Sequence, residues 1–419
     1  MSQAMKLTTG PARTWLFAWI AASVLALLPC SSRANIVTDW NEKAFVAMEE
    51  EKVLGGFELA RILAIMHAAM FDAVNAVDKR YMSFSGATID ATGASPEVAV
   101  HAAAHRALVD LLPKQKPMLD AAFNAAMLRS PDGAARSIGI SVGEKAAMTV
   151  VEQRKTDGVD SPNTYRPFTA AGVYVPTTMP ALTVVAGIKP LVLTSVSQFR
   201  PGPPYALSSA SWARDYNETR ELGSISSTQR SAWQTETAHF WVLVGTPAWN
   251  QVARSLAAAR PQPLVESARL FAHINIAIAD AFLAVFDAKY HYNFWRPITA
   301  IRNGDQDGNA ATERDAGWTP VIETPLHPEY PCAHCTVDGS AGAVLKSVFG
   351  AGQVPAFTLT SADMPGVTRR YTSIRQLEDE VSMARIWGGV HFRTSIEVGY
   401  ALGTQVGGYV LSNSLQPVR

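Results

Sequence analysis

The sequence has little cysteine, no excess of charge of either sign, and no uninterrupted apolar run of membrane-spanning length after its first 34 residues. Its 419 residues include 3 cysteines, 36 basic and 36 acidic side chains. This balance argues against a nucleic-acid partner, which would require a clear basic excess. The most apolar later stretch, residues 270–288, is interrupted by histidine, asparagine and aspartate. We therefore expect no membrane span in the mature chain.

The first 34 residues have the features of a secretory signal peptide. Lys6 and Arg13 form a positive flank, and the apolar run of residues 15–28 is too short to span a bilayer comfortably. Residues 32–34 supply the small side chains that a signal peptidase reads, so we predict cleavage after Ala34 and a secreted or periplasmic protein. An uncleaved membrane anchor is the alternative. Cleavage would leave 33 basic against 36 acidic residues, a net charge of −3.

Two cysteines, Cys332 and Cys335, remain after this cleavage. In an oxidising compartment their Cys-x-x-Cys spacing can close a disulfide. The alternative is a pair of free thiols, of which Cys332 takes part in an anion-binding site. Zinc is disfavoured, because the two thiols and His334 would need a fourth ligand and their spacing differs from that of zinc knuckles.

Helical periodicity predicts an all-α protein. Residues 58–77 place apolar side chains three and four positions apart, as a helix with one buried face requires. Residues 157–206 contain 8 prolines, which exclude long helices, while their aromatic residues indicate an ordered connecting arm. The loop 303–331 is rich in Asp, Gly and Pro and is interpreted as turns. Further helical patterns cover residues 96–128, 135–156, 209–222, 227–241, 336–349, 376–387 and 396–411.

An internal repeat with an offset of 208 residues supports a duplicated architecture. Ala60-Arg61 and Asp72 recur as Ala268-Arg269 and Asp280 within similar apolar helices. We predict two related helical bundles joined by the Pro-rich arm. The predicted division is a signal peptide at 1–34, an N-terminal bundle with the arm at 35–206, and a C-terminal catalytic domain at 207–419.

Three short fragments collect basic residues and histidines in the C-terminal half. They are Lys289-x6-Arg296-Pro297, Pro331-Cys332-Ala333-His334, and Arg385-x5-His391. Their named positions include three cations and two histidines, and no acidic residue lies within the fragments. Arginine and lysine suit the oxygens of a compact oxyanion, and histidine can ligate, attack or transfer protons near neutral pH. The fragments therefore predict an oxyanion site.

The order and spacing of the fragments resemble one superfamily, which includes vanadium-dependent haloperoxidases, bacterial acid phosphatases and type-2 phosphatidic acid phosphatases. Its pattern is Lys-x6-Arg-Pro, then Pro-Ser-Gly-His, then Ser-Arg-x5-His-x3-Asp. The first fragment fits fully. In the second, Cys332 and Ala333 replace Ser and Gly, and in the third, Ala384 and Ser395 replace the leading Ser and the closing Asp. The chain resembles the soluble, haloperoxidase-like branch, which has the all-α architecture of two related bundles.

The resemblance implies an anion-binding set and a cofactor. Lys289, Arg296 and Arg385 would bind the equatorial oxygens of vanadate, the implied cofactor, or of phosphate, which can occupy the same site. Cys332 would take the position of the serine that donates to the anion. Ala333 would take that of the glycine whose backbone N–H does so.

The resemblance also gives each histidine a task. His391 would bond vanadium, as vanadate, in a peroxidase, or attack phosphorus in a phosphatase. His334 would be the catalytic acid–base. Because Ser395 stands where the family has the aspartate that orients the vanadium-bonding histidine, we expect its hydroxyl to accept the ring N–H of His391. Glu397 is the nearby carboxylate that could substitute for that aspartate.

Two further positions bear on the substrate. His327 lies five residues before the serine position, where bromoperoxidases carry His and chloroperoxidases Phe, and Phe286 lies where chloroperoxidases carry Trp. We assign both to a halide pocket and predict a haloperoxidase that oxidises bromide or iodide, rather than chloride, with hydrogen peroxide. The alternatives are a periplasmic acid phosphatase that hydrolyses a phosphomonoester through a phosphohistidine, and a degenerate relative that only binds phosphate or vanadate. The expected partners are hydrogen peroxide and halide, or a phosphomonoester. Whether the protein forms a homodimer is left open.

Overall fold

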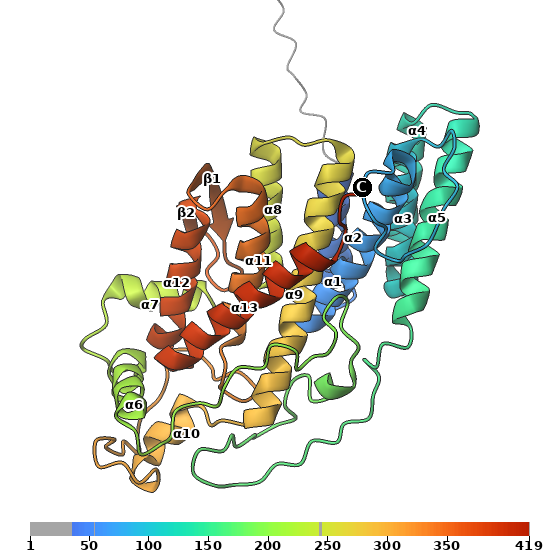
Figure 1. Cartoon of the computed structure of the whole chain (residues 1–419). Coiled ribbons are helices and arrows are strands. Elements are labelled where there is room, and N and C mark those ends of the chain that lie inside the picture. The colour runs from blue at the N-terminus through green and yellow to red at the C-terminus, as the bar shows by residue number, and fades with distance from the viewer. Residues whose placement is uncertain (1–35, 54, 243–244, 419) are drawn as a thin grey trace, which may run out of the picture. The chain divides into compact units, whose positions relative to one another are not determined.

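The computed structural model describes residues 36–53, 55–242 and 245–418, and most of these are helical (Figure 1). Within them lie thirteen α-helices, three short 3-10 helices and one two-stranded antiparallel sheet. The predicted all-α class is confirmed. The predicted signal peptide and its cleavage after Ala34 lie outside the described residues.

Two long helices that carry the internal repeat, α2 (Gly56–Asp78) and α9 (Leu264–Tyr292), pack against each other in the core. Among the described residues, α9 alone is long and apolar enough to cross a membrane, with a mean hydropathy of 1.6 over its most apolar window. Of that window, 94% is buried inside the protein. Its apolar surface is therefore already covered by neighbouring helices.

The aspartates of the repeat perform the same structural task in both copies. Asp72 of α2 accepts the backbone N–H groups of Phe84 and Ser85 at 2.6 and 2.9 Å. Asp280 of α9 accepts those of residues 191–193 at 2.7, 2.8 and 2.9 Å. Each buried carboxylate thus fixes a connecting loop by satisfying backbone donors. The two copies of the sequence repeat therefore form two helices that pack against each other and hold a loop in the same way.

Of the N-terminal helices, α3 and α5 pack directly against α2, and α4 packs against α3. The stretch 96–128, predicted as one helix, is divided, because Pro113 lacks an N–H and starts a 3-10 turn. The helices are α1 (Ile36–Glu50), α3 (Pro96–Leu111), α4 (Lys116–Arg129) and α5 (Ala134–Arg154).

The Pro-rich arm crosses from these helices to the C-terminal half without an α-helix, as its prolines predict. It contains one 3-10 turn, η2 (Val185–Gly187). Arg200 forms a two-pronged ion pair with Asp287 of α9 at 2.7 and 2.8 Å. Upstream, the backbone of Tyr174 donates to the carbonyl of Asn293 at 2.8 Å. The arm therefore runs beside the C-terminal end of α9.

The C-terminal half differs from the prediction in several elements. The helices α8 and α10 and the hairpin of β1 and β2 were not predicted, and α7 begins at Ala232 rather than 227, because Ser231 and Gln234 form a capping box there. The boundary predicted between residues 206 and 207 stays a prediction. The elements are α6 (Ala210–Gly223), α7 (Ala232–Phe240), α8 (Thr246–Ala259), α10 (Pro297–Arg302), η3 (Gly304–Gln306), α11 (Ala333–Phe349), β1 (Gln353–Thr360), β2 (Thr368–Ser373), α12 (Ile374–Trp387) and α13 (Arg393–Asn413).

Candidate active site

Each residue of the predicted oxyanion site lies at or next to the end of a helix. Lys289 is in the last turn of α9, Arg296 directly precedes α10, and Cys332 caps the start of α11. Arg385 is in the last turn of α12, and His391 lies two residues before α13. The starts of α10, α11 and α13 place the positive ends of helix dipoles beside these residues. This surrounding suits an anion.

A glycine turn positions the last of these residues. Gly389, between α12 and His391, has φ 75°, in the left-handed region that favours glycine. A Cβ there would lie 2.5 Å from the carbonyl oxygen of Gly223 in α6. The close approach and the φ angle both require glycine, and the turn brings His391 back beside the end of α12.

Three cations are buried at this site. Lys289, Arg296 and Arg385 are 0%, 1% and 1% exposed. Lys289 donates through Nζ to the carbonyl oxygens of Pro328 and Glu329 at 2.9 and 2.8 Å. Burial, and then the charge of Arg296, lower the pKa of Lys289 well below its ordinary value. Concentrated buried positive charge of this kind is costly unless an anion neutralises it.

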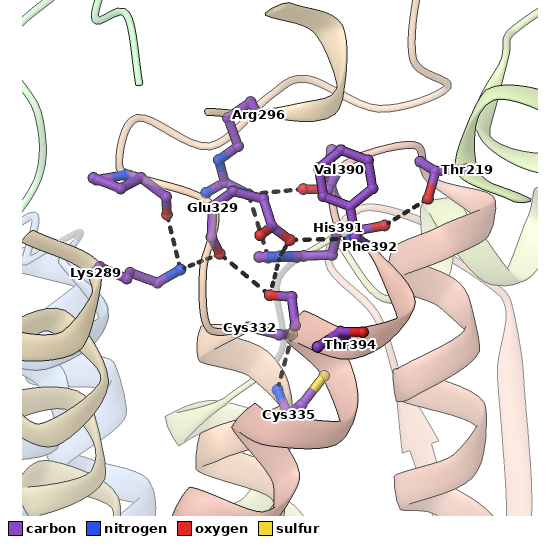
Figure 2. Close-up of polar contacts among 12 residues, drawn as sticks. Thr219, Lys289, Arg296, Glu329, Cys332, Cys335, Val390, His391, Phe392 and Thr394 are labelled. Carbon is purple, nitrogen blue, oxygen red and sulfur yellow. Dashed lines mark hydrogen bonds and ion pairs between the residues drawn. The ribbon is translucent and has the colours of Figure 1, made fainter. Parts of the chain in front are cut away.

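Arg296 joins the loop before α11 to the loop before α13 (Figure 2). It donates through Nε to the carbonyl of His327 at 2.8 Å and through Nη2 to the ring Nδ1 of the same residue at 2.9 Å. Through Nη1 it donates to the carbonyl of Val390 at 2.9 Å and meets Nε2 of His391 at 3.3 Å. Burial lowers the pKa of Arg296 to about 10, against the opposing effect of Glu329.

The hydrogen bonds of His391 define its tautomer. Arginine can only donate, so Nε2 of His391 is the acceptor in its contact with Arg296. The proton then resides on Nδ1, which donates to Oε1 of Glu329 at 2.8 Å. The same oxygen accepts the backbone N–H of Phe392 at 3.0 Å. Burial and then the charge of Arg296 lower the pKa of His391 well below its ordinary value, so a neutral ring presents the Nε2 lone pair to the cations.

Glu329 is the residue of this cluster that the sequence prediction missed. The hydroxyl of Ser395, predicted to accept the ring N–H, lies 3.5 Å from Nδ1 of His391, against 2.8 Å for Glu329. Glu397, the carboxylate considered as a substitute, is exposed on α13 and has no part in the pair. The feature of the sequence that could have identified it is its position just before the second fragment, as a glutamate among prolines and a tyrosine. Glu329 is 0% exposed, which a charge tolerates only with partners.

Arg385 and His334 are the remaining two members of the cluster. Arg385 donates through Nη1 to the carbonyl of Trp241 at 2.6 Å, and its buried Nε has no partner among the described residues. His334 donates from Nε2 to the carbonyl of Val242 at 3.2 Å, which leaves Nδ1 as the free base. Burial and then the charge of Arg385 lower the pKa of His334 well below its ordinary value.

Both cysteines are free and buried in the structure. The predicted alternatives were a disulfide and a pair of free thiols, and the structure contains the free thiols. Sγ of Cys332 accepts the N–H of Cys335 at 3.3 Å and so caps α11. Burial opposes ionisation of Cys332, but the hydrogen bond from Cys335 and the charge of Arg385 outweigh it and lower its pKa. Ala333 begins α11 in helical conformation, so alanine can replace glycine there without strain.

The two residues assigned to the halide pocket are in contact. The rings of Phe286 and His327 lie 4.9 Å apart at 54°. Phe286 is 5% exposed. Burial, followed by the charges of Lys289 and Arg296, lowers the pKa of His327 well below its ordinary value. An uncharged imidazole thus lies between an apolar ring and the guanidinium of Arg296.

The buried carboxyl of Glu329 gives a pH-dependent stability. Burial raises its pKa from 4.5 to about 7, so the folded state favours the protonated form between these values. Its stabilising contribution is fully present below about pH 4.5 and is lost as the pH rises through about 7. Glu329→Gln cannot ionise. The free energy of unfolding of the variant, relative to the wild type, should therefore rise by up to about 3 kcal/mol across this interval.

Urea unfolding of both proteins without vanadate, at half-unit pH steps between 4.5 and 8, measures this difference. Glu397→Gln, an exposed glutamate on α13, is the matched control and should follow the wild type at every pH. If the free energy of unfolding varied with pH in the same way for wild type and Glu329→Gln, a raised pKa of the Glu329 carboxyl would be contradicted.

Residues 269–419 match the family described as the VCPO second helical-bundle domain. The vanadium chloroperoxidase of Curvularia inaequalis is 25% identical over 269 residues, which cover 48% of this chain and 43% of that protein. The match thus spans less than half the length of this curated relative.

Solved structures extend the likeness over most of the chain. A structure described as the first bacterial vanadium-dependent iodoperoxidase superposes with a TM-score of 0.77 at 25% identity, and the match covers 91% of this chain and 98% of the other. A bacterial vanadium-dependent chloroperoxidase in its apo form gives a TM-score of 0.69 at 17% identity over 86% of this chain and 95% of the other. At that identity the likeness concerns the fold alone.

The fold and the cluster define a helical protein with a buried, cationic, histidine-containing site. The resemblance predicted from the three fragments is confirmed: the chain has the fold of the vanadium haloperoxidases, and its residues 269–419 match the family of their second helical-bundle domain.

Proposed function

We propose that this protein is a vanadate-dependent haloperoxidase that oxidises iodide or bromide, rather than chloride, with hydrogen peroxide. The observation that carries the proposal is the neutral ring of His391, whose Nε2 lone pair faces Arg296 while Glu329 holds Nδ1. Such a ring is preorganised to ligate an oxyanion from within a cluster of cations. We further propose that the protein is exported, on the strength of the signal-like residues 1–34 alone.

The residues present fit vanadate. The buried carboxyl of Glu329 faces Lys289 and Arg296, and that of Asp338 acts on Arg385. Nε of Arg385 still has no partner among the described residues, so an added anion would give this buried donor an acceptor. Vanadate when bound would supply a Lewis-acidic centre at which peroxide is activated for two-electron oxidation of halide. The residues that would hold it are Lys289, Arg296, Cys332, Ala333 through its backbone N–H, Arg385 and His391.

The protein's own groups account for the protons of the reaction. Oxidation of halide X⁻ follows H2O2 + X⁻ + H⁺ → HOX + H2O, so one proton is taken up for each peroxide. His334, with Nδ1 free and Nε2 committed to the carbonyl of Val242, is suited to take a proton from peroxide and return it to the departing oxygen. Its lowered pKa keeps the ring in the base form near neutral pH.

The halide preference rests on His327 and Phe286. A buried imidazole offers the halide a polar edge, and Phe286 closes the pocket with apolar bulk. The resemblance associates a histidine at the position of His327 with bromide oxidation. The similarity to the structure described as an iodoperoxidase supports iodide as a substrate.

The proposal is tested by loading the apo-protein with orthovanadate and following triiodide formation from iodide and bromination of phenol red, with chloride in a parallel assay. We expect turnover with iodide and bromide that requires both vanadate and peroxide. His391→Ala should bind vanadate weakly and lose this turnover. Hydrolysis of p-nitrophenyl phosphate that needs no vanadium and is inhibited by it would contradict the proposal and indicate a phosphatase. Tight vanadate binding without any turnover would contradict it in favour of a non-catalytic relative.

Cys332 gives an independent prediction about the anion site. A thiol is a weak hydrogen-bond donor, and Cys332→Ser would provide the hydroxyl of the related sequences. We expect vanadate to bind about fivefold more tightly, the equivalent of about 1 kcal/mol for one improved hydrogen bond. The variant should also resist inactivation by excess peroxide, because serine cannot form a sulfenic acid.

Vanadate titration of the apo-protein and residual activity after peroxide treatment measure the two effects. Cys335→Ser, which leaves Cys332 in place, is the control and should retain the peroxide sensitivity. Equal vanadate affinity and equal inactivation in Cys332→Ser and wild type would exclude Cys332 from the anion site.

A further inference from the structure

The two buried thiols at the start of α11 are in contact with each other (Figure 2). Sγ of Cys332 accepts the backbone N–H of Cys335 at 3.3 Å, and the two thiols also share a side-chain hydrogen bond. Cα atoms three residues apart in a helical turn are about 5 to 6 Å from each other, which is a separation that a disulfide spans. Rotation about side-chain bonds therefore brings the two sulfur atoms together.

The backbone of Cys332 is held in place on several sides. Its N–H donates to the carbonyl of Ser395 at 3.0 Å, and its carbonyl accepts the hydroxyl of Thr336 at 2.8 Å. Gly399 of α13 packs so closely that a Cβ there would lie 2.5 Å from the carbonyl oxygen of Cys332. A bond between the sulfur atoms thus changes two side chains and leaves the packing of α11 against α13 intact.

The surroundings give the two thiols different tasks. Burial opposes ionisation of Cys332, but the hydrogen bonds from Cys335 and the charge of Arg385 outweigh it and lower its pKa. Burial, and then the hydrogen bond with Cys332, raise the pKa of Cys335 well above its ordinary value. Oxidation by peroxide follows thiolate character, which a helix start and a nearby arginine favour. Cys332 is therefore the thiol that is oxidised first, and Cys335 is placed to attack the product.

We propose that Cys335 is a resolving thiol: hydrogen peroxide oxidises Cys332 to a sulfenic acid, and Cys335 then closes a reversible disulfide that switches the anion site off. The proposal rests on the proposed function, which brings peroxide to this site. In the first step the O–O bond breaks and an S–O bond forms, so that RSH + H2O2 → RSOH + H2O. In the second, the sulfur of Cys335 displaces hydroxide, which leaves with the thiol proton as water, so that RSOH + R′SH → RSSR′ + H2O. A dithiol reductant reopens the bond by thiol–disulfide exchange.

The disulfide changes the anion site and also protects it. Bonded to Cys335, the sulfur of Cys332 has no proton to donate, so vanadate should bind about fivefold more weakly for the loss of one hydrogen bond. A sulfenic acid with no thiol partner advances to sulfinic acid, which dithiols do not reduce. Cys335 therefore converts an irreversible oxidation of the vanadate-free protein into a reversible one.

Peptide mapping by mass spectrometry of the vanadate-free protein after peroxide treatment tests the bond. In wild type, the peptide that contains both cysteines should lose its thiol hydrogens and regain them with dithiothreitol. Cys335→Ser should instead be trapped by dimedone as a sulfenic acid and, without dimedone, advance to a sulfinic acid that dithiothreitol does not reverse. Wild type that forms sulfinic acid at Cys332 with no disulfide, or in which Cys332 stays reduced, overturns the proposal.

Protection by phosphate tests whether the reaction takes place at the anion site. Phosphate is not oxidised by peroxide, and at about ten times its dissociation constant it should slow disulfide formation about tenfold by occupying the site. Sodium chloride at the same ionic strength is the control and should leave the rate unchanged. Equal rates with and without phosphate overturn the placement of the switch in the anion site.

Equilibrium dialysis of orthovanadate tests the consequence without turnover. Oxidised wild type should bind vanadate about fivefold more weakly, and should recover after dithiothreitol treatment, with the reductant removed before vanadate is added. Oxidised Cys335→Ser should not recover, and Cys332→Ser should bind equally before and after peroxide. Equal affinity in oxidised and reduced wild type overturns the switch. Absence of halide oxidation in the reduced wild type would instead overturn the proposed function, and the peptide map would still decide whether the disulfide forms.

Discussion

Glu329→Gln should weaken vanadate binding and slow halide oxidation by about 10- to 100-fold, the usual cost of losing the partner that orients a metal-ligating histidine. The carboxylate holds Nδ1–H of His391 at 2.8 Å and fixes the adjacent backbone through Phe392 at 3.0 Å. Glutamine retains the size but no longer stabilises the ring by charge, and its amide can present N–H instead of oxygen. Vanadate affinity, from activity recovered during titration, and turnover at saturating vanadate separate the two losses.

The related sequences supply a rescue experiment. They carry an aspartate where this chain has Ser395, whose Oγ lies 3.5 Å from Nδ1 of His391. Ser395→Asp in the Glu329→Gln background should recover most of the lost vanadate affinity, because the carboxylate approaches the same ring nitrogen. Glu397→Gln is the control and should have no effect, since that side chain is exposed. Full activity in Glu329→Gln, or failure of Ser395→Asp to restore any affinity in a folded double variant, would contradict the positioning role.

Arg385→Met should remove vanadate binding while leaving the vanadate-free protein about as stable as the wild type. Arg385 is 1% exposed, lies in a cluster with Lys289 and Arg296, and leaves its Nε unpaired among the described residues. Removing one of three buried cations relieves desolvation and repulsion, which offsets the lost bond to the carbonyl of Trp241 at 2.6 Å. Turnover should fall by about a hundredfold or more, because charge-assisted bonds to the oxyanion are lost.

Thermal unfolding with and without orthovanadate checks both halves of this prediction. At a vanadate concentration about 100 times the dissociation constant, the wild type should gain about 2.7 kcal/mol of stability, whereas Arg385→Met should gain almost none. Arg375→Met, an exposed arginine on the same helix, is the matched control and should keep the full gain. A vanadate-dependent stabilisation equal to that of wild type in Arg385→Met would exclude Arg385 from the anion site.

Sequence periodicity predicted the helical class, and the three fragments predicted which cations and histidines meet in the buried cluster, because both depend on short, local patterns. The contact between Glu329 and His391 joins residues 62 positions apart and appears only once the loop before α11 folds against the start of α13. The family pattern pointed to Ser395 instead, because a sequence pattern places the acid at a fixed position after the histidine. It cannot show that a carboxylate from a different loop contacts the same ring. The hairpin was missed because Pro355 interrupts the alternation in its first strand and the second is only six residues long.

The most direct test of the central claim is a crystal structure of the protein soaked with orthovanadate. The account predicts vanadium bonded to Nε2 of His391, with its oxygens contacted by Lys289, Arg296 and Arg385, while Nδ1 of the same ring stays on Glu329. Vanadium bound elsewhere, or an oxyanion in this cluster with no bond to His391, would contradict it.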